Sequence, residues 1–264
     1  MEIINSLNNL KIKETVRLRK SGARREQGLM IIDGKREILA AIKAKVEIIR
    51  LFYCPELIKE RNGTMADLLG VSSDKVVETS QPAFLKICYK ENPDGFLAVA
   101  KQPDLSLSRI KIAAQPLVVV LESVEKPGNL GAIIRSSYAA GVDAIIINDN
   151  QTDIYNPNTI RASEGLIFNQ TLAIATVEET VDWLKAHGIK SFAAATSAKQ
   201  DYWQADLKSG AALVFGSEAE GLTRKWLKAA DQSLKIPMRQ GVDSLNVSVS
   251  AALLIFEVKR QRRR

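Results

Sequence analysis

The sequence predicts an α/β protein of two domains, the second of them built on a mainly parallel sheet. The chain has 264 residues, which is long for one compact α/β unit, so its length favours two domains. After Pro116, short apolar runs alternate with helical segments, as in buried parallel strands joined by helices. Before Pro103, a basic amphipathic opening precedes a shorter pattern of strands and one helix. We therefore expect a small α/β domain followed by a larger one.

The domain boundary is expected in the stretch KQPDLSLSRIKIAAQP, whose periodicity is weak and which two prolines bracket. The predicted limits are 1–105 for the first domain, 106–116 for the linker and 117–264 for the second domain. In the first domain we expect strands at 29–32, 47–52 and 95–99 and a helix at 35–44. In the second domain we expect strands at 117–121, 144–147, 172–175, 192–195, 213–215 and 234–236.

The charge of the chain favours a polyanionic partner. Lysine and arginine outnumber aspartate and glutamate by 37 to 30, and the excess gathers near the two ends. Near the start, four cations recur at helical spacing, so one helix through them would present a basic face to RNA phosphates: Lys13, Arg17, Lys20 and Arg24. A merely solvated face explains the same spacing. The basic end at 259–264 is also predicted to face phosphate.

Several classes of protein are disfavoured. Cys54 and Cys88 lack the paired spacing of a metal site or a disulfide framework, which fits a reducing cytosol. The longest apolar stretch falls short of the roughly 18 residues that suggest a membrane span. We therefore expect a cytoplasmic protein with no membrane partner and no metal. His187 stands at a predicted helix end, where a catalytic role is not expected.

Ligands of open α/β sheets gather at the carboxyl ends of the strands, and the loop after the first strand of the second domain is a candidate. In ESVEKPGNLGAIIRSS, Pro127 and Gly128 predict a turn, and Asn129 is expected to cap a helix that carries Arg135. Such a helix start suits an anion. A capped helix with a surface arginine accounts for the pattern equally well.

Two later loops carry further candidates. In FGSEAEGLT, Gly216 and Gly221 permit close approach of the backbone to a ligand. Glu218 and Glu220 in the same loop favour a cationic ligand. Alternatively, the segment is simply an acidic turn that precedes a helix. Further on, IPMRQGVDSLNVSVSAALLIFEVKR places polar side chains at the mouth of an apolar helix expected at 245–258. Ser244 and Asn246 would orient a ligand there. Alternatively, Asp243 or Ser244 caps that helix and Asn246 faces solvent.

Taken in order, NLGAIIR, LVFGSEAEGL and IPM followed by SLNVSVSAA resemble the SpoU or TrmH class of RNA ribose 2'-O-methyltransferases. The resemblance covers nearly all of the chain after Pro116. It implies a SPOUT fold with a trefoil knot, S-adenosyl-L-methionine as cofactor and a homodimer. The apolar helix at 245–258, more hydrophobic around its circumference than one sheet face demands, is the expected dimer contact.

The resemblance also assigns roles by position. The implied catalytic residues are Asn129, Arg135, Glu218, Ser244 and Asn246. The implied cofactor-binding residues are Gly216, Gly221, Ile236, Met238 and Leu245. The sequence departs from the family at Lys126, where many members carry an acidic residue. A guanidinium normally stays protonated, so we expect Arg135 to anchor phosphate and stabilise charge rather than to act as the base.

The first domain resembles the substrate-binding domain that often precedes this catalytic domain. The resemblance lies in the segments REQGLMIIDGKREILAAI and NPDGFLAVA. The predicted function is therefore methyl transfer to an RNA ribose 2'-hydroxyl, with large-subunit ribosomal RNA ahead of transfer RNA. The rival from another class is a non-catalytic RNA-binding protein that keeps the fold. A Rossmann oxidoreductase is disfavoured because PGNLG has the wrong spacing for its glycine fingerprint. The segment NPNTIRASEGLIF is a candidate for the rim of the active site through Asn156, Arg161 and Ser163.

Overall fold

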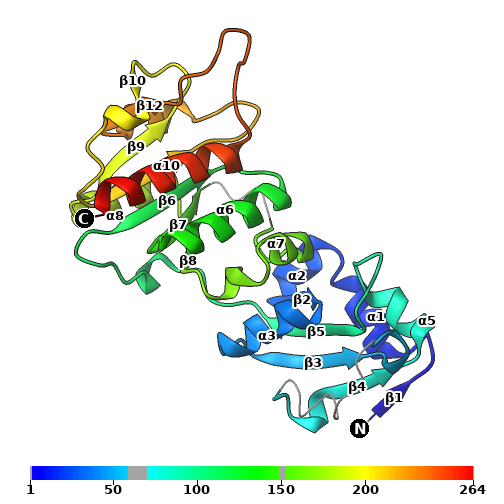
Figure 1. Cartoon of the computed structure of the whole chain (residues 1–264). Coiled ribbons are helices and arrows are strands. Elements are labelled where there is room, and N and C mark those ends of the chain that lie inside the picture. Colours follow the sequence, from blue (N-terminus) through cyan, green and yellow to red (C-terminus); the bar gives the residue numbers. More distant parts are fainter. Residues whose placement is uncertain (1, 59–69, 149–152, 264) are drawn as a thin grey trace. The chain divides into compact units, whose positions relative to one another are not determined.

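The computed structural model describes residues 2–58, 70–148 and 153–263 (Figure 1). Two compact units divide the chain, and each has its own sheet. The first unit comprises Met1–Pro103 together with Asp153–Asn169, and the second comprises Asp104–Thr152 together with Gln170–Arg264. The expected α/β class is thereby confirmed.

The first unit is a mixed sheet covered by helices. Its strands, in spatial order, are β1 (Glu2–Ile4), β4 (Val76–Thr79), β3 (Ile48–Tyr53), β5 (Phe96–Lys101) and β2 (Leu29–Asp33). Strands β1, β4 and β3 run parallel, whereas β5 is antiparallel to both of its neighbours. The strands expected at 29–32, 47–52 and 95–99 are present, while β1 and β4 were not expected. The helices are α1 (Leu10–Arg17), α2 (Ser21–Gln27), α3 (Lys35–Lys43), α5 (Gln81–Ile87) and α7 (Pro157–Ala162).

The expectation of one basic helix through residues 13 to 24 is wrong, because α1 ends at Arg17 and α2 begins at Ser21. The cause lies in Arg24. Its guanidinium donates to the main-chain oxygens of Leu18 and Arg19, so these carbonyls are bound by a side chain instead of by the next helical turn.

Arg24 also does not face RNA. It is 1% exposed and forms an ion pair with Asp153, a residue that belongs to the same unit although it follows β7 in the sequence. Lys13, Arg17 and Lys20 remain exposed, as predicted. The segment with Asn156, Arg161 and Ser163 packs in this unit too, where α7 contacts β2.

The second unit is built on a sheet that runs β10-β12-β9-β11-β6-β7-β8 in its described part. The strands are β6 (Leu117–Glu122), β7 (Ala144–Asn148), β8 (Leu172–Ile174), β9 (Lys190–Ala194), β10 (Gln200–Asp201), β11 (Ala211–Phe215) and β12 (Gln232–Lys235). Every neighbouring pair among them is parallel, which confirms the predicted parallel sheet. The two-residue strand β10 was too short for the apolar pattern to predict.

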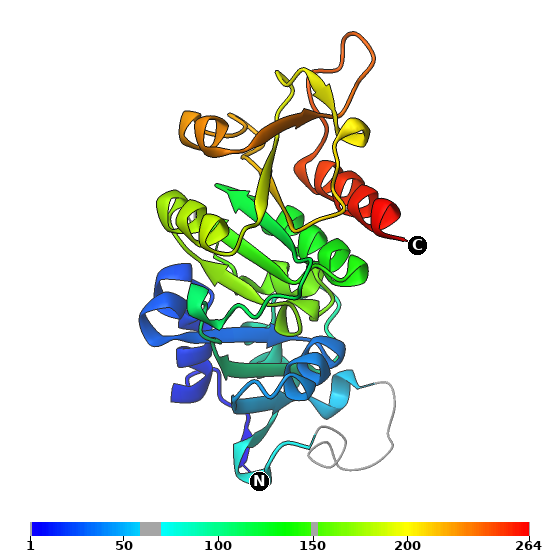
Figure 2. The same ribbon diagram turned by 90° about the vertical axis from the view of Figure 1, so that its left-hand side faces the viewer.

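Helices cover both faces of this sheet. They are α6 (Pro127–Ala140), α8 (Val177–Ala186), α9 (Arg224–Ala229) and α10 (Val247–Arg262). Figure 2 shows α6 and α10 side by side on one face, with α8 and α9 on the other, and both pairs are in contact. The central strands β6, β7 and β11 are buried along their whole length, which explains their continuous apolar runs.

The basic C-terminal end is partly structural, so the prediction that 259–264 faces phosphate is wrong for Arg262. The Arg262 guanidinium donates to four main-chain oxygens, those of Gln115, Pro116, Leu207 and Ser209. Arg260 forms an ion pair with Glu257 one turn away. The Arg262 contacts with Gln115 and Pro116 fix the end of α10 to the residues just before β6. Arg264 lies outside the described residues.

Over the described residues, no helix is long and apolar enough to cross a membrane. Cys54 and Cys88 are free and buried, and burial raises the pKa of both thiols. Neither thiol is therefore poised as a nucleophile at neutral pH.

Candidate active site

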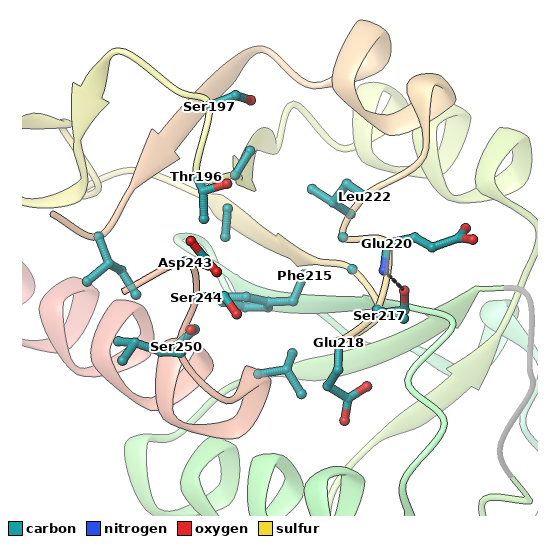
Figure 3. A pocket seen from close by; sticks show the side chains of 18 of the residues that line it. Thr196, Ser197, Phe215, Ser217, Glu218, Glu220, Leu222, Asp243, Ser244 and Ser250 are labelled. Carbon is teal, nitrogen blue, oxygen red and sulfur yellow. Dashed lines mark hydrogen bonds between the residues drawn. The ribbon is translucent and has the colours of Figure 1, made fainter. Parts of the chain in front are cut away.

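A cleft lies at the carboxyl edge of the second sheet, where β9, β11 and β12 end (Figure 3). Its volume is about 350 Å³, within the range of small-molecule sites. Three stretches of chain and Leu227 of α9 line it; the stretches are residues 194–197 at the end of β9, residues 215–222 at the end of β11, and residues between Leu234 and Ser250. The parallel order of the sheet brings these loops together, because they all leave the same edge.

The loop after β11 is folded tightly onto itself. The main-chain N–H groups of Ser217 and Gly221 each donate to the other residue's carbonyl oxygen, both at 3.1 Å, and the Glu220 N–H donates to Ser217 Oγ. A Cβ atom on Gly216 would stand 2.1 Å from the Gly221 carbonyl carbon. Only glycine fits there, so the backbone forms the wall of the cleft. We call residues 216–222 the cleft loop.

Every residue that the resemblance implied for cofactor binding lines this cleft, and these are Gly216, Gly221, Ile236, Met238 and Leu245. Thr196 and Ser197 also line the cleft, and they could not be predicted because they follow an ordinary apolar strand with no motif around them. Glu218, Glu220 and Asp243 contribute carboxylates to the lining. A cationic, partly apolar ligand therefore suits the cleft.

Beside the cleft, three predicted residues form one hydrogen-bonded cluster. The Asn129 side-chain amide donates to the Glu218 carboxylate, and the Asn246 side-chain amide donates to Asn129 Oδ1 at 3.1 Å. Asn246 Oδ1 in turn accepts from the main-chain N–H and the hydroxyl of Ser248. These bonds join α6, the cleft loop and the start of α10. They fix the orientation of both amides, because each donor faces an acceptor.

The helix starts differ from the sequence predictions. Asn129 is not a cap: α6 begins at Pro127 after Lys126, so Asn129 lies in the first turn with its side chain directed to Glu218. Asn246, rather than Asp243 or Ser244, caps α10, which begins at Val247 and not at 245. Asn246 is exposed, yet it is hydrogen-bonded on both sides of its amide.

The two other predicted catalytic residues, Ser244 and Arg135, are not among the three residues of this cluster. Ser244 lines the cleft at the segment before α10. Arg135 lies on α6, six residues beyond Asn129 and exposed, outside the residues that line the cleft. His187 is the C-cap of α8, as expected, and its Nδ1 lies 2.8 Å from the Trp183 carbonyl oxygen.

Two buried polar residues at this edge escaped the sequence analysis. Glu122 ends β6 and accepts hydrogen bonds from Thr223, and Asn148 ends β7 and accepts one from the indole N–H of Trp226. The sequence carries one weak signal for both residues, because each is the polar residue that ends an apolar strand. No group of three or more metal-binding side chains converges in the described part of the chain.

The fold and the cleft define an α/β protein that holds a small ligand at the carboxyl edge of a parallel sheet, beside a cluster of amide and carboxylate side chains. The chain belongs to the SpoU rRNA Methylase family, whose model matches residues 116–256. Residues 9–98 match the model of the MRM3-like substrate binding domain. This membership confirms the expected class of enzyme, an S-adenosylmethionine-dependent RNA 2'-O-ribose methyltransferase.

Relatives match along the whole chain. The 23S rRNA (guanosine(2553)-2'-O)-methyltransferase RlmP of Bacillus subtilis is 28% identical over 98% of this chain and 100% of its own length. A crystal structure of an RNA 2'-O ribose methyltransferase is 36% identical, with a TM-score of 0.84 over 98% of this chain and 99% of that one. The AdoMet-bound rRNA methyltransferase of Sinorhizobium meliloti is 26% identical, with a TM-score of 0.90 over 100% and 99%.

Proposed function

We propose that this protein methylates a ribose 2'-hydroxyl of large-subunit ribosomal RNA, with the cofactor in the cleft described above. The observation that carries the proposal is the cluster of Asn129, Glu218 and Asn246, drawn from three distant segments to the mouth of that cleft. The Bacillus subtilis relative, which acts on 23S rRNA by its name, supports the choice of RNA because it aligns end to end.

The cleft fits the cofactor chemically. The cofactor is cationic at its sulfur, and the carboxylates of Glu218, Glu220 and Asp243 favour a cation there. The wall formed by Gly216 allows backbone contact without a side chain, while Ile236 and Met238 add apolar surface. These residues would hold the cofactor. When bound, it supplies a methyl group on a positively charged sulfur.

The residues of the cluster would then position the ribose. Asn129 and Asn246, fixed by their mutual hydrogen bond, would orient the ribose 2'-hydroxyl together with the Ser244 hydroxyl and so place it for methyl transfer from the cofactor. Transfer of the methyl group to the 2'-oxygen would leave the cofactor as a neutral thioether, and the hydroxyl proton would pass to solvent water beside the exposed Ser244 and Asn246. Arg135 binds the adjacent phosphate and stabilises negative charge developing on the oxygen.

The activity test separates RNA classes. The protein is incubated with labelled S-adenosylmethionine and purified ribosomal or transfer RNA, and the labelled nucleosides are identified by mass spectrometry. We expect label in a 2'-O-methylnucleoside of large-subunit RNA, and loss of label with Arg135→Ala. Label in transfer RNA alone would assign the other substrate. Cofactor binding without transfer to any RNA would favour the non-catalytic RNA-binding protein.

The first unit would grip the RNA. Lys13 and Arg17 on α1, with Lys20 in the following turn, are exposed and carry positive charge, whereas Arg24 is excluded by its burial. Phosphate contacts of this kind weaken steeply with salt. The triple variant Lys13→Ala, Arg17→Ala, Lys20→Ala is expected to bind RNA more weakly and with a shallower salt dependence.

We also propose that the protein is a homodimer through α10. Val249, Leu253 and Phe256 recur at helical spacing on that helix and are 48%, 39% and 49% exposed. Tyr138 on the neighbouring α6 is exposed as well. An exposed apolar stripe of this kind is typical of a protein–protein contact. In analytical ultracentrifugation, we expect the parent protein to sediment as a dimer and the Phe256→Glu variant to sediment as a monomer.

Two further expectations stay proposals. A trefoil knot is supported by the path of the chain, which leaves β12 beside β9 and returns to α10, a helix in contact with α6 and β11. An experimental trace of residues 215–247 tests it. A cytoplasmic location is supported by the two free thiols. Fractionation of the cells that make the protein tests that location.

A further inference from the structure

Two buried polar side chains stand next to each other at the carboxyl edge of the second sheet. Glu122 ends β6 and Asn148 ends β7, and they are register partners in this parallel pair. Glu122 is 1% exposed and Asn148 is fully buried. Buried polar groups at a strand end need hydrogen-bond partners, and both find them in the segment that follows the cleft loop.

Glu122 binds the residue directly after the cleft loop. Its Oε2 accepts from the Thr223 N–H at 2.8 Å, and its Oε1 accepts from the Thr223 hydroxyl at 2.7 Å. One step earlier, β6 and β11 are paired at Leu121 and Phe215, the residue that precedes the cleft loop. Strand β6 therefore holds the cleft loop at both ends. Strand pairing with β11 holds the residue before the loop, and the Glu122 carboxylate holds the residue after it.

Asn148 holds the next helix. Its Oδ1 accepts from the indole N–H of Trp226 at 3.0 Å, and Trp226 is a fully buried residue of α9. Its amide donates to the Ala175 carbonyl oxygen at 2.9 Å and to the Thr180 hydroxyl at 2.7 Å. All the hydrogen-bonding groups of this amide are thus used, and α9 cannot shift along the sheet without breaking a buried bond.

The geometry points to Glu122 and Asn148 as positioning residues for the cofactor: together they clamp Thr223 and Trp226 and so set the shape of the cleft loop. The inference rests on the proposed placement of the cofactor in the cleft. It adds that cofactor affinity is set by side chains that do not line the cleft. Since the loop supplies backbone to the cleft wall, a shift at Thr223 is transmitted directly to the ligand contacts.

The chain offers a matched control for the carboxylate. Asp231 Oδ2 accepts from the N–H of Ser191 at 2.8 Å and from its hydroxyl at 2.7 Å, the same pair of bonds that Glu122 makes. That pair lies at the start of β9, away from the cleft loop. Asp231→Ala therefore removes the same kinds of hydrogen bond, from an exposed carboxylate, and leaves the contacts of Glu122 and Asn148 intact.

The experiment measures S-adenosylmethionine binding to the full chain by calorimetry. Glu122→Ala, which removes both hydrogen bonds to Thr223, and Thr223→Val, which removes the one from the hydroxyl, are expected to raise the Kd by about tenfold or more. Glu122→Gln is expected to stay within about threefold, because its amide oxygen still accepts from the Thr223 N–H and its amide N–H donates to the Thr223 hydroxyl. Asp231→Ala is expected to leave the Kd unchanged within about twofold.

Hydrogen exchange supplies a second readout. Glu122→Ala is expected to speed the exchange of the amides of residues 217–221 and not of the amides in β9. Where Glu122→Ala does not fold, Thr223→Val and Trp226→Phe carry the same comparison, since Trp226→Phe removes only the indole donor to Asn148. The clamp is overturned if Thr223→Val binds the cofactor as the parent protein does, or if Asp231→Ala weakens binding equally.

One further variant separates failure of the clamp from failure of the cofactor placement. Ser250→Trp would fill the cleft that Ser250 lines. Normal cofactor binding by this variant would place the cofactor elsewhere and refute the proposed site. Loss of binding by Ser250→Trp, with normal binding by the clamp variants, would refute the clamp alone.

Discussion

Asn246 donates a hydrogen bond from its side-chain amide to the side-chain oxygen of Asn129, 117 residues earlier in the chain, at 3.1 Å. The bond joins the cap of α10 to the first turn of α6. It leaves the Asn129 amide group directed to Glu218, so one side chain receives and passes on a hydrogen bond within the cluster. This relationship makes Asn129 the residue on which the geometry of the proposed site depends most.

We predict that Asn129→Asp lowers the rate of methyl transfer at least about 100-fold, a loss typical of removing one positioned donor. The reason is electrostatic, because the new carboxylate would face Glu218 and could not donate to it. The cofactor Kd should change by less than about threefold, because the main-chain hydrogen bonds that shape the cleft loop stay intact in this variant. Single-turnover kinetics and calorimetry separate the two effects.

The outcome that counts against this account is weak cofactor binding by Asn129→Asp at an unchanged single-turnover rate. That result would place Asn129 in the cofactor site. Asn129→Ala serves as the companion variant, because it removes the donor without adding charge and should lose rate by a similar factor.

We predict that Gly216→Ala abolishes cofactor binding, because the new Cβ would stand 2.1 to 2.3 Å from backbone atoms of Gly221 and Leu222. The cleft loop would have to open to accept it. The control is Gly22→Ala on α2, where a Cβ meets nothing within 4 Å. Titration of both variants with S-adenosylmethionine checks the expectation, and a Gly216→Ala protein with unchanged affinity would show that the loop is not the cleft wall.

We predict that Arg24→Ala lowers the free energy of unfolding of the first unit by about 3 kcal/mol, since it removes a buried guanidinium that binds the half-buried Asp153 carboxylate and the carbonyl oxygens of Leu18 and Arg19. Arg25→Ala, on the same helix but exposed, should cost less than about 0.5 kcal/mol. Scanning calorimetry of the two variants compares them. Equal, small losses would mean that the Arg24 side chain is not held as described.

We predict a pH-dependent contribution from Glu257. The hydrogen bonds from the Arg260 guanidinium lower the pKa of this carboxyl below its ordinary 4.5, against the opposing effect of burial. Because the folded pKa is the lower one, the stabilisation is present above about pH 4.5 and is lost as the pH falls through the folded value. Glu257→Gln should therefore lose stability at pH 7 and show a weaker decline below pH 4.5 in urea unfolding.

A Glu257→Gln protein whose stability falls with acid as steeply as that of the parent would contradict this assignment. Glu179 offers a comparison on an exposed helix start, since its pKa is lowered by hydrogen bonds from Thr176. Screening by solvent should make its effect on stability the smaller of the two.

The parallel sheet could be predicted from sequence because its strands are buried on both faces and read as unbroken apolar runs. The three loops of the site could be predicted only together, since Asn129 in isolation fits a helix cap. Its actual partner, Glu218, lies 89 residues away, and no local pattern reveals that contact. Long-range hydrogen bonds of this kind depend on the order of the strands in the sheet.

Two of the errors, at Arg24 and Arg262, share one physical cause. Arg24 and Arg262 look like surface cations in the sequence, and each instead binds main-chain oxygens. Charge alone does not show whether an arginine meets phosphate or backbone carbonyls, because its guanidinium suits both. Glu122 was missed for the converse reason: one acidic residue at the end of an apolar run carries no motif.

The most direct test of the central claim is the mapping of methyl groups on ribosomal RNA. Large-subunit RNA from cells that lack this protein is incubated with the purified enzyme and labelled S-adenosylmethionine, and the labelled nucleosides are separated. We expect label on one ribose 2'-oxygen, incorporated at least about 100-fold more slowly by Asn129→Asp than by the parent enzyme. Label on a base, or equal label with Asn129→Asp, would contradict this expectation.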